Sequence, residues 1–256
     1  MNVLVTLAFD GTNYHGFQVQ KNGQSICEAF QDGLEKVFGV RLDVKGCSRT
    51  DAGVHALGFR LNFHVQTKIP LQKMPLALNQ VLPLDIRVIN AQQVVEDFHA
   101  RYSAHSKEYL YRIRNSNIDS PFDKPYYWRC TYPLNIEKMQ QAAQLLVGTH
   151  DFAAFMSAGS NIIDTVRTIY RFDVTKEEDM VYCKVNANGY LYNMVRIMCG
   201  TLMEIGIGKL PVEQIQTALQ TKQRQDAGIT LPPQGLFLNQ VYYLPESEDI
   251  EWPKEP

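Results

Sequence analysis

The chain has 256 residues, of which 45% are hydrophobic, 20% charged and 11% aromatic, close to the usage of an ordinary globular protein. This composition disfavours a disordered, collagen-like or coiled-coil protein, and the length predicts one large domain or two modest ones. The net charge of −2 conceals an asymmetry, because residues 246–256 carry −4 and the remainder carries +2. We expect 246–256 to be a solvated acidic tail, and any anion site to depend on local clusters of Arg and Lys.

The longest apolar stretches are strand-length, far below the ~18 residues of a membrane span, and no basic segment typical of a secretory signal follows Met1. We therefore expect a cytoplasmic protein with no membrane partner. The five cysteines lie far apart and form no C-x-x-C pair, so we expect reduced, buried thiols and no metal site.

Hydrophobic periodicity predicts the elements of the first half in chain order. Residues 3–9 alternate as a strand that ends at Asp10. Ser25 and Glu28 have the spacing of a capping box, and apolar residues then recur at helical spacing up to Gly39. Apolar and polar residues alternate over 59–66, which predicts a strand with one face exposed. The first half ends with a short helix over 75–81 and a strand over 86–95.

The second half has a similar pattern and completes an α+β protein. Strands are predicted near 107–114, 166–175, 180–187 and 236–243, and helices over 136–147, over 191–205 and from Pro211. Two successive mixed α/β halves with antiparallel sheets are favoured over a parallel doubly wound sheet. We place the halves at 1–105 and 106–245.

A polar, glycine-flanked loop at 46–56 is the first candidate site. Its Asp51 follows Arg49 by two residues and precedes small residues, so a substrate could approach a carboxylate that Arg49 keeps ionised. A turn held by an Asx-type hydrogen bond is the competing structural interpretation of the same pattern.

A basic segment with interleaved aromatic residues, 99–114, is the second candidate. Cations that meet phosphates and rings that stack on bases suit RNA. The alternative is a strand with Tyr109, Tyr111 and Ile113 toward the core and a charged outer face. Arg196 is a further candidate, although an exposed charge on a helix is the favoured interpretation there. Arg167 and Arg171 could contact phosphate, but a salt-bridged strand edge is equally compatible with them.

The motifs, taken in order, resemble the tRNA pseudouridine synthases of the A type (TruA family). They occupy 9–18, 48–56, 98–101, 107–111, 148–152, 166–169, 194–196 and 227–230. One departure is visible, because the family usually has Gly where this chain has Ser48. A serine is tolerated there if its φ is negative and is strained if its φ is positive.

The resemblance implies two α+β halves joined side by side with an active-site cleft between them, and a homodimer. It implies isomerisation of uridine to pseudouridine at positions 38, 39 and 40 of the tRNA anticodon stem-loop. That reaction needs no cofactor or metal. A catalytically silent RNA-binding protein on the same scaffold is the main alternative, and a glycoside hydrolase, which needs a second carboxylate, is a more distant one.

The resemblance also implies roles for individual residues. Asp51 matches the catalytic aspartate, Arg49 and Arg196 match positions that bracket it, and Tyr109 matches a ring that packs under the flipped uridine. The carboxylate could attack C1′, add to C6 or remove the 2′ proton, and we favour proton removal. The candidates for phosphate contact are Arg101, Lys107, Arg112, Arg114, Arg167 and Arg171.

Overall fold

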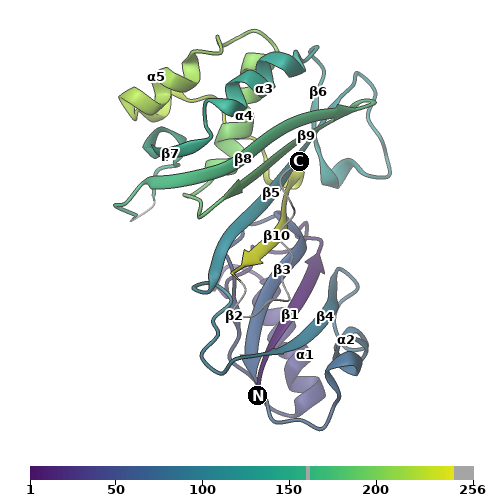
Figure 1. The fold of residues 1–256 in the computed structure, drawn as a ribbon. Helices are drawn as coiled ribbons and strands as arrows, with labels where there is room; N and C mark the ends of the chain where they lie inside the picture. Colours follow the sequence, from purple (N-terminus) through teal and green to yellow (C-terminus); the bar gives the residue numbers. More distant parts are fainter. Residues whose placement is uncertain (160–161, 245–256) are drawn as a thin grey trace. The chain divides into compact units, whose positions relative to one another are not determined.

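The computed structural model describes residues 1–159 and 162–244, which divide into two compact units (Figure 1). Unit 1 comprises Met1–Lys107 and the C-terminal strand from Leu238 onward, and unit 2 comprises Glu108–Phe237. Two strands, β5 (Ala104–Asn115) and β10 (Leu236–Tyr243), contribute residues to both units. The acidic tail expected at 246–256 lies outside the described residues.

The C-terminal strand does not belong wholly to the predicted second half. The predicted boundary at 105/106 assigns the whole strand to the second half. In the structure, its residues from Leu238 onward belong to unit 1, where β10 pairs with β3. The Tyr243 hydroxyl donates to the carbonyl oxygen of Ala100 at 2.9 Å, and the Phe98 and Tyr243 ring centroids are 5.0 Å apart. Periodicity predicts a strand, but it does not predict which strand lies beside it.

The sheet of unit 1 is built around β1 (Asn2–Phe9). This strand pairs antiparallel with β3 (His55–His64) on one side and with β4 (Ile86–Val94) on the other, and the short β2 (Lys45–Gly46) also pairs with β3. Six of the eight residues of β1 are buried and the other two are partly buried, as expected for a central strand with side chains packed on both faces.

Two helices complete unit 1. In α1 (Ile26–Phe38), the Ser25 hydroxyl accepts a hydrogen bond from the Glu28 N–H at 3.1 Å, which caps the first turn, and Gly39 ends the helix at φ 74°. Both boundaries of α1 are therefore those that the sequence predicted. The short α2 (Met74–Asn79) confirms the helix expected near 75–81.

The sheet of unit 2 runs in the order β5, β9 (Met180–Ala187), β8 (Val166–Glu177) and β7 (Gly148–Asp151). The β7–β8 and β8–β9 pairs are antiparallel. The short β6 (Trp128–Cys130) pairs with β5 in parallel, so the α+β class is confirmed but the sheet is mixed rather than purely antiparallel.

Three α-helices belong to unit 2: α3 (Ile136–Gln144), α4 (Met194–Gly206) and α5 (Gln214–Thr221). The predicted helix from residue 191 begins at Met194, because Asn193 adopts a left-handed conformation at φ 60°. The helix predicted from Pro211 begins at Gln214, after a turn. Short 3-10 helices lie at Leu71–Lys73, Lys124–Tyr126, Ala153–Phe155, Arg224–Asp226 and Pro233–Gly235.

The cysteine side chains and the helices can be compared with the expectations from the sequence. All five cysteines are buried and carry free thiols, which confirms the expectation of reduced, buried thiols. Among the described residues, no helix is both long and apolar enough to span a membrane.

Candidate active site

The loop that carries Asp51 connects β2 to β3 in unit 1 and is held by a segment from the start of the chain. We call residues 48–54 the Asp51 loop and residues 10–18 the supporting segment. The Phe17 N–H donates to the carbonyl oxygen of Thr50 at 3.2 Å, and the Gly53 N–H donates to that of Tyr14 at 3.2 Å. These two bonds fix the backbone on both sides of Asp51.

Two glycines let the supporting segment come this close. At Gly16, where φ is +84°, a Cβ would lie 2.3 Å from the carbonyl oxygen of Thr50. At Gly11, a Cβ would lie 2.0 Å from the carbonyl oxygen of Val54. Real Cβ atoms do not approach backbone oxygens so closely, so both contacts require glycine. The sequence alone indicated a loop at this segment, without its supporting role.

The supporting segment is itself tied to unit 1 at two points. The Gly11 N–H donates to Nδ1 of His55, a buried side chain at the start of β3, at 3.0 Å. The Tyr14 hydroxyl donates to the Asp85 carboxylate at 2.6 Å, and burial together with this carboxylate raises the pKa of Tyr14 above its usual value. The loop therefore rests on a framework that continues into β3 and the start of β4.

Asp51 is half-buried, and its neighbours Arg49 and Ala52 are exposed. A carboxylate at such a place is accessible to a substrate, while the surrounding backbone is fixed. Ser48, the departure noted under the resemblance, does not have a positive φ, because the non-glycine residues with positive φ in the described chain are Glu178, Asn193 and Lys222. The serine therefore fits this loop without backbone strain.

The other two predicted site residues of unit 1 lie on or near β5. Arg101 is exposed, and its guanidinium carbon lies 5.6 Å from the centroid of the Tyr102 ring. Lys107 is partly buried, and burial lowers its pKa below the usual value. Because Lys107 is partly buried, its ammonium group contributes positive charge to this part of unit 1 while it is only partly hydrated.

In unit 2, β5 has the alternation that the structural interpretation predicted. Tyr109, Tyr111 and Ile113 are buried, whereas Arg112 and Arg114 are partly exposed. This confirms a strand whose aromatic residues face the core. It leaves Arg112 and Arg114, which are partly exposed, on the opposite face of the strand.

The arginines of β5 already have partners within unit 2. The Arg112 guanidinium lies over the Phe237 ring at 4.2 Å, and its Nε has no hydrogen-bond partner among the described residues. Arg114 forms an ion pair with Asp179 at 2.9 Å. Binding of a phosphate at Arg114 would therefore compete with a carboxylate, and the Nε of Arg112 is itself buried.

The remaining predicted cations of unit 2 are held mainly by local contacts. Arg167 donates to the carbonyl oxygen of Val166 at 2.6 Å, and Arg171 pairs with Asp173 at 2.5 Å. Nε of Arg196, on α4, donates to the carbonyl oxygen of Leu231 at 2.6 Å. The side chain of Arg171 is largely exposed, so its ion pair is weak and exchangeable.

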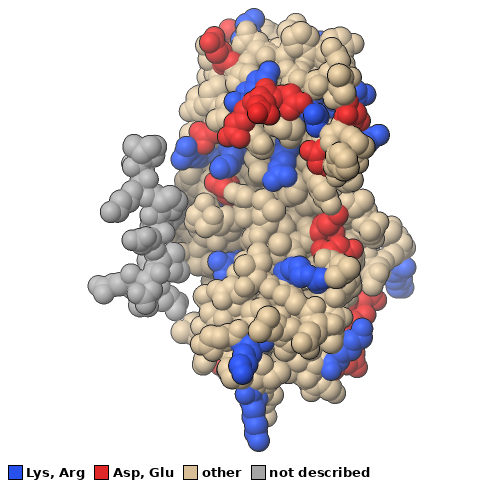
Figure 2. Space-filling view, turned by 90° about the vertical axis from the view of Figure 1, so that its right-hand side faces the viewer, with Lys and Arg blue, Asp and Glu red and all other residues tan. Residues whose placement is uncertain are grey.

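Charges of both signs are interspersed on the face shown in Figure 2, which has no continuous basic surface. This agrees with the expectation that anion binding depends on local clusters. Among the described residues, no group of three or more His, Cys, Asp or Glu side chains is placed to hold a metal ion.

Comparison with known proteins settles the family. A model of the family described as "tRNA pseudouridine synthase" matches residues 6–103 and 142–244. The chain belongs to the tRNA pseudouridine synthase family. A tRNA pseudouridine synthase A of Thermoanaerobacter sp. is 49% identical over 242 residues, which cover 94% of this chain and 99% of that protein. One of Lacticaseibacillus casei is 43% identical over 244 residues, covering 93% and 98%.

The family assignment confirms the resemblance to the A type and the prediction of an isomerase that forms pseudouridine. The roles of Asp51, Arg49, Tyr109 and Arg196, and the cleft between the halves, stay predictions. Sequence reasoning missed the supporting function of residues 10–18. The signal for it in the sequence is a pair of glycines that flank Tyr14, Gly11 and Gly16.

Proposed function

We propose that this chain isomerises uridine to pseudouridine at positions 38, 39 and 40 of the tRNA anticodon stem-loop, with Asp51 as the catalytic residue. The observation that carries the proposal is a half-buried carboxylate on a loop whose backbone is fixed by the supporting segment. A pre-organised carboxylate suits chemistry on a substrate that must be held in one geometry.

The proposed reaction breaks the bond from C1′ to N1 and forms a bond from C1′ to C5 of the same uracil. In the route we favour, Asp51 removes the 2′ proton as the uracil leaves through N1, which gives a glycal. The uracil rotates, C5 bonds to C1′ and Asp51 returns the proton to C2′. Loss of the C5 proton and protonation of N1 complete the isomerisation, with no net exchange of atoms.

The target uridine has to leave the base stack before this chemistry can start. Eversion costs a few kcal/mol, which contacts in the pocket have to offset. We assign Tyr109 to stacking under the everted base, and Arg49 and Arg196 to keeping the carboxylate charged and the base extruded. The buried ring of Tyr109 packs edge-on against Tyr190 at 4.9 Å, which supports a fixed stacking surface.

We assign Arg101, Lys107, Arg112, Arg114, Arg167 and Arg171 to contacts with tRNA phosphates. Arg101 is the strongest candidate on its local contacts, because it is exposed and its guanidinium lies over the Tyr102 ring rather than in an ion pair among the described residues. Arg114 and Arg171 would have to exchange an ion pair for a phosphate. We also propose that the enzyme is a cytoplasmic homodimer.

Replacing Tyr109 with Phe should lower turnover more than RNA binding. The ring and its packing on Tyr190 remain, so the dissociation constant should change less than about 3-fold, while loss of the hydroxyl should slow the reaction about 3- to 10-fold. Single-turnover rates and filter binding with an anticodon stem-loop RNA measure both.

Tyr111→Phe is the matched control, because this tyrosine lies on the same strand and its hydroxyl donates to the carbonyl oxygen of Pro232 at 2.7 Å. It should lower stability and leave the rate unchanged. Equal losses of binding and turnover in Tyr109→Phe would count against the assigned role.

The decisive experiment is incubation with unmodified tRNA, followed by position-resolved detection of pseudouridine. Product at positions 38, 39 and 40 supports the proposal. Binding without product supports the silent RNA-binding alternative, and free uracil or an abasic site supports hydrolysis. Salt titration does not separate these outcomes, since phosphate contacts weaken with salt in each case.

A further inference from the structure

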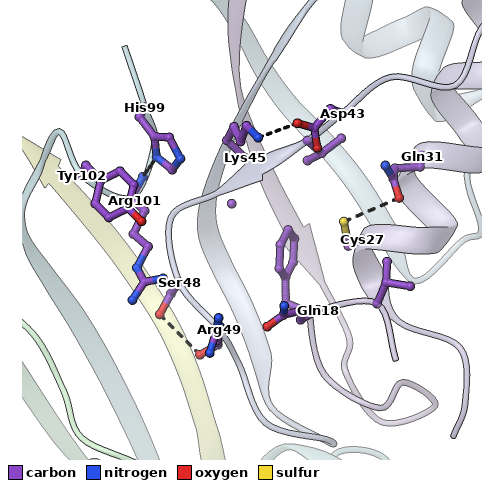
Figure 3. Close-up of a pocket in the computed structure, with 14 residues that line it drawn as sticks. Gln18, Cys27, Gln31, Asp43, Lys45, Ser48, Arg49, His99, Arg101 and Tyr102 are labelled. Carbon is purple, nitrogen blue, oxygen red and sulfur yellow. Dashed lines mark hydrogen bonds and ion pairs between the residues drawn. The ribbon is translucent and has the colours of Figure 1, made fainter. Parts of the chain in front are cut away.

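A cavity of about 480 Å³ opens in unit 1 beside the Asp51 loop (Figure 3). Its apolar part is formed by Phe17, Cys27 and Val44, which are buried. Ser48 and Arg49 line it from the Asp51 loop. The volume lies within the range of about 300–1,000 Å³ that is typical of small-molecule sites. The function proposed above gives roles to two of its lining residues, Arg49 and Arg101, but assigns no ligand to the cavity itself.

Three cationic side chains line the cavity, namely Lys45, Arg49 and Arg101. They come from β2, the Asp51 loop and the segment before β5. The only acidic residue among the lining residues, Asp43, pairs with Lys45 at 2.5 Å. The lining therefore has an excess of positive charge, which favours an anionic ligand such as a phosphodiester.

An aromatic pair faces the same cavity. The His99 and Tyr102 rings have centroids 4.4 Å apart, and Tyr102 is 76% exposed. Although exposed, the pair is carried by a defined turn, because the Ser103 N–H donates to the carbonyl oxygen of His99 at 2.9 Å. An exposed ring on a fixed turn is a surface on which an unpaired base can stack.

One hydrogen bond and partial burial both favour the neutral form of His99. The Arg101 backbone N–H donates to its Nδ1 at 3.1 Å, so Nδ1 carries no proton in this arrangement. Burial, followed by the charge of Lys45, lowers the pKa of His99. A neutral imidazole carries no positive charge to attract a second phosphate, and its ring face can contact a nucleobase.

We propose that this cavity binds a second unpaired nucleotide of the RNA substrate, with its base on Tyr102 and His99 and its phosphate facing Lys45, Arg49 and Arg101. The proposal rests on the proposed function. Ser48 and Arg49 line the cavity from the loop that carries Asp51, so a nucleotide bound here would lie beside the loop that we propose acts on the target uridine. Holding two nucleotides of one loop would fix which uridine reaches Asp51.

The test combines a protein variant with RNAs that lack one base at a time. Binding of an unmodified anticodon stem-loop is measured for Asp51→Asn and for Asp51→Asn with Tyr102→Ala, so that no turnover occurs. Tyr102→Ala should weaken binding about 5- to 150-fold, the range for loss of one stacked base. Tyr102→Phe, which keeps the ring, should stay within about 3-fold.

The position of the bound base follows from abasic substitutions in the loop. At one loop position other than the target uridine, removal of the base should weaken binding to the Asp51→Asn protein, which keeps Tyr102. The same removal should not weaken binding to the protein that also carries Tyr102→Ala, because the stacking contact is already lost. Tyr132→Ala, which removes a tyrosine that is 64% exposed in unit 2, is the control and should not alter binding. Unchanged binding in Tyr102→Ala, or losses that add at every position, would overturn the proposal.

A free nucleotide has the same base and phosphate groups and could occupy the cavity instead of the RNA. Binding of uridine 5′-monophosphate tests this alternative. Micromolar binding that depends on Tyr102, without coupling to any loop base, would overturn the RNA assignment. Pseudouridine formation by the unaltered enzyme is measured in parallel. If Tyr102 and one loop base depend on each other for binding but no pseudouridine forms, the cavity assignment stands and the proposed function is rejected. If pseudouridine forms but no loop base depends on Tyr102, the proposed function stands and the cavity assignment is rejected.

Discussion

Asp51→Asn is expected to abolish pseudouridine formation while RNA affinity stays within a few-fold. The amide has the shape of the carboxylate but cannot take up a proton or act as a nucleophile at neutral pH, so the rate should fall at least about 10²- to 10⁴-fold. The fold should persist, because the loop is held by backbone groups of Thr50 and Gly53.

Asp97→Asn is the matched control, since it makes the same change at an exposed aspartate of unit 1. It should leave the rate unchanged. Single-turnover assays with excess enzyme report the chemical step, and thermal melting reports the fold. Turnover retained in Asp51→Asn would show that another group performs the proton transfer.

Most of the regular elements could be predicted because their residues repeat with a clear period. Strands β9 and β10 have the predicted bounds, 180–187 and 236–243, and α1 has the predicted cap and stop. The three residues of β6 and the four of β7 are too few to show a period, and the polar sequence of β7 resembles a loop. These two strands were therefore not predicted.

The site was predicted in part. Arg49 and Asp51 could be identified from one short polar loop because they are close in sequence. The contacts that fix that loop join it to residues about 35 positions earlier, and periodicity contains no information on such pairings. The cavity likewise combines Lys45 with Tyr102, which no single motif places together.

The supporting segment leads to a second large effect, expected for Gly16→Ala. Alanine at φ +84° is strained, and its Cβ would lie 2.3 Å from the carbonyl oxygen of Thr50. The backbone beside Asp51 then has to move. A displacement near 1 Å of a catalytic group can cost about 10²-fold in rate, so we expect a loss of that size with a smaller effect on RNA affinity.

Gly39→Ala separates backbone strain from this collision. Gly39 has φ +74°, close to that of Gly16, but a Cβ there would have no neighbour within 4 Å beyond the adjacent residues. Both variants should lose roughly 1–2 kcal/mol of unfolding free energy from left-handed strain, measured by urea denaturation. Only Gly16→Ala should lose turnover. If both variants kept full activity, contact with the supporting segment would not be what positions Asp51, because the strain is shared and the collision is not.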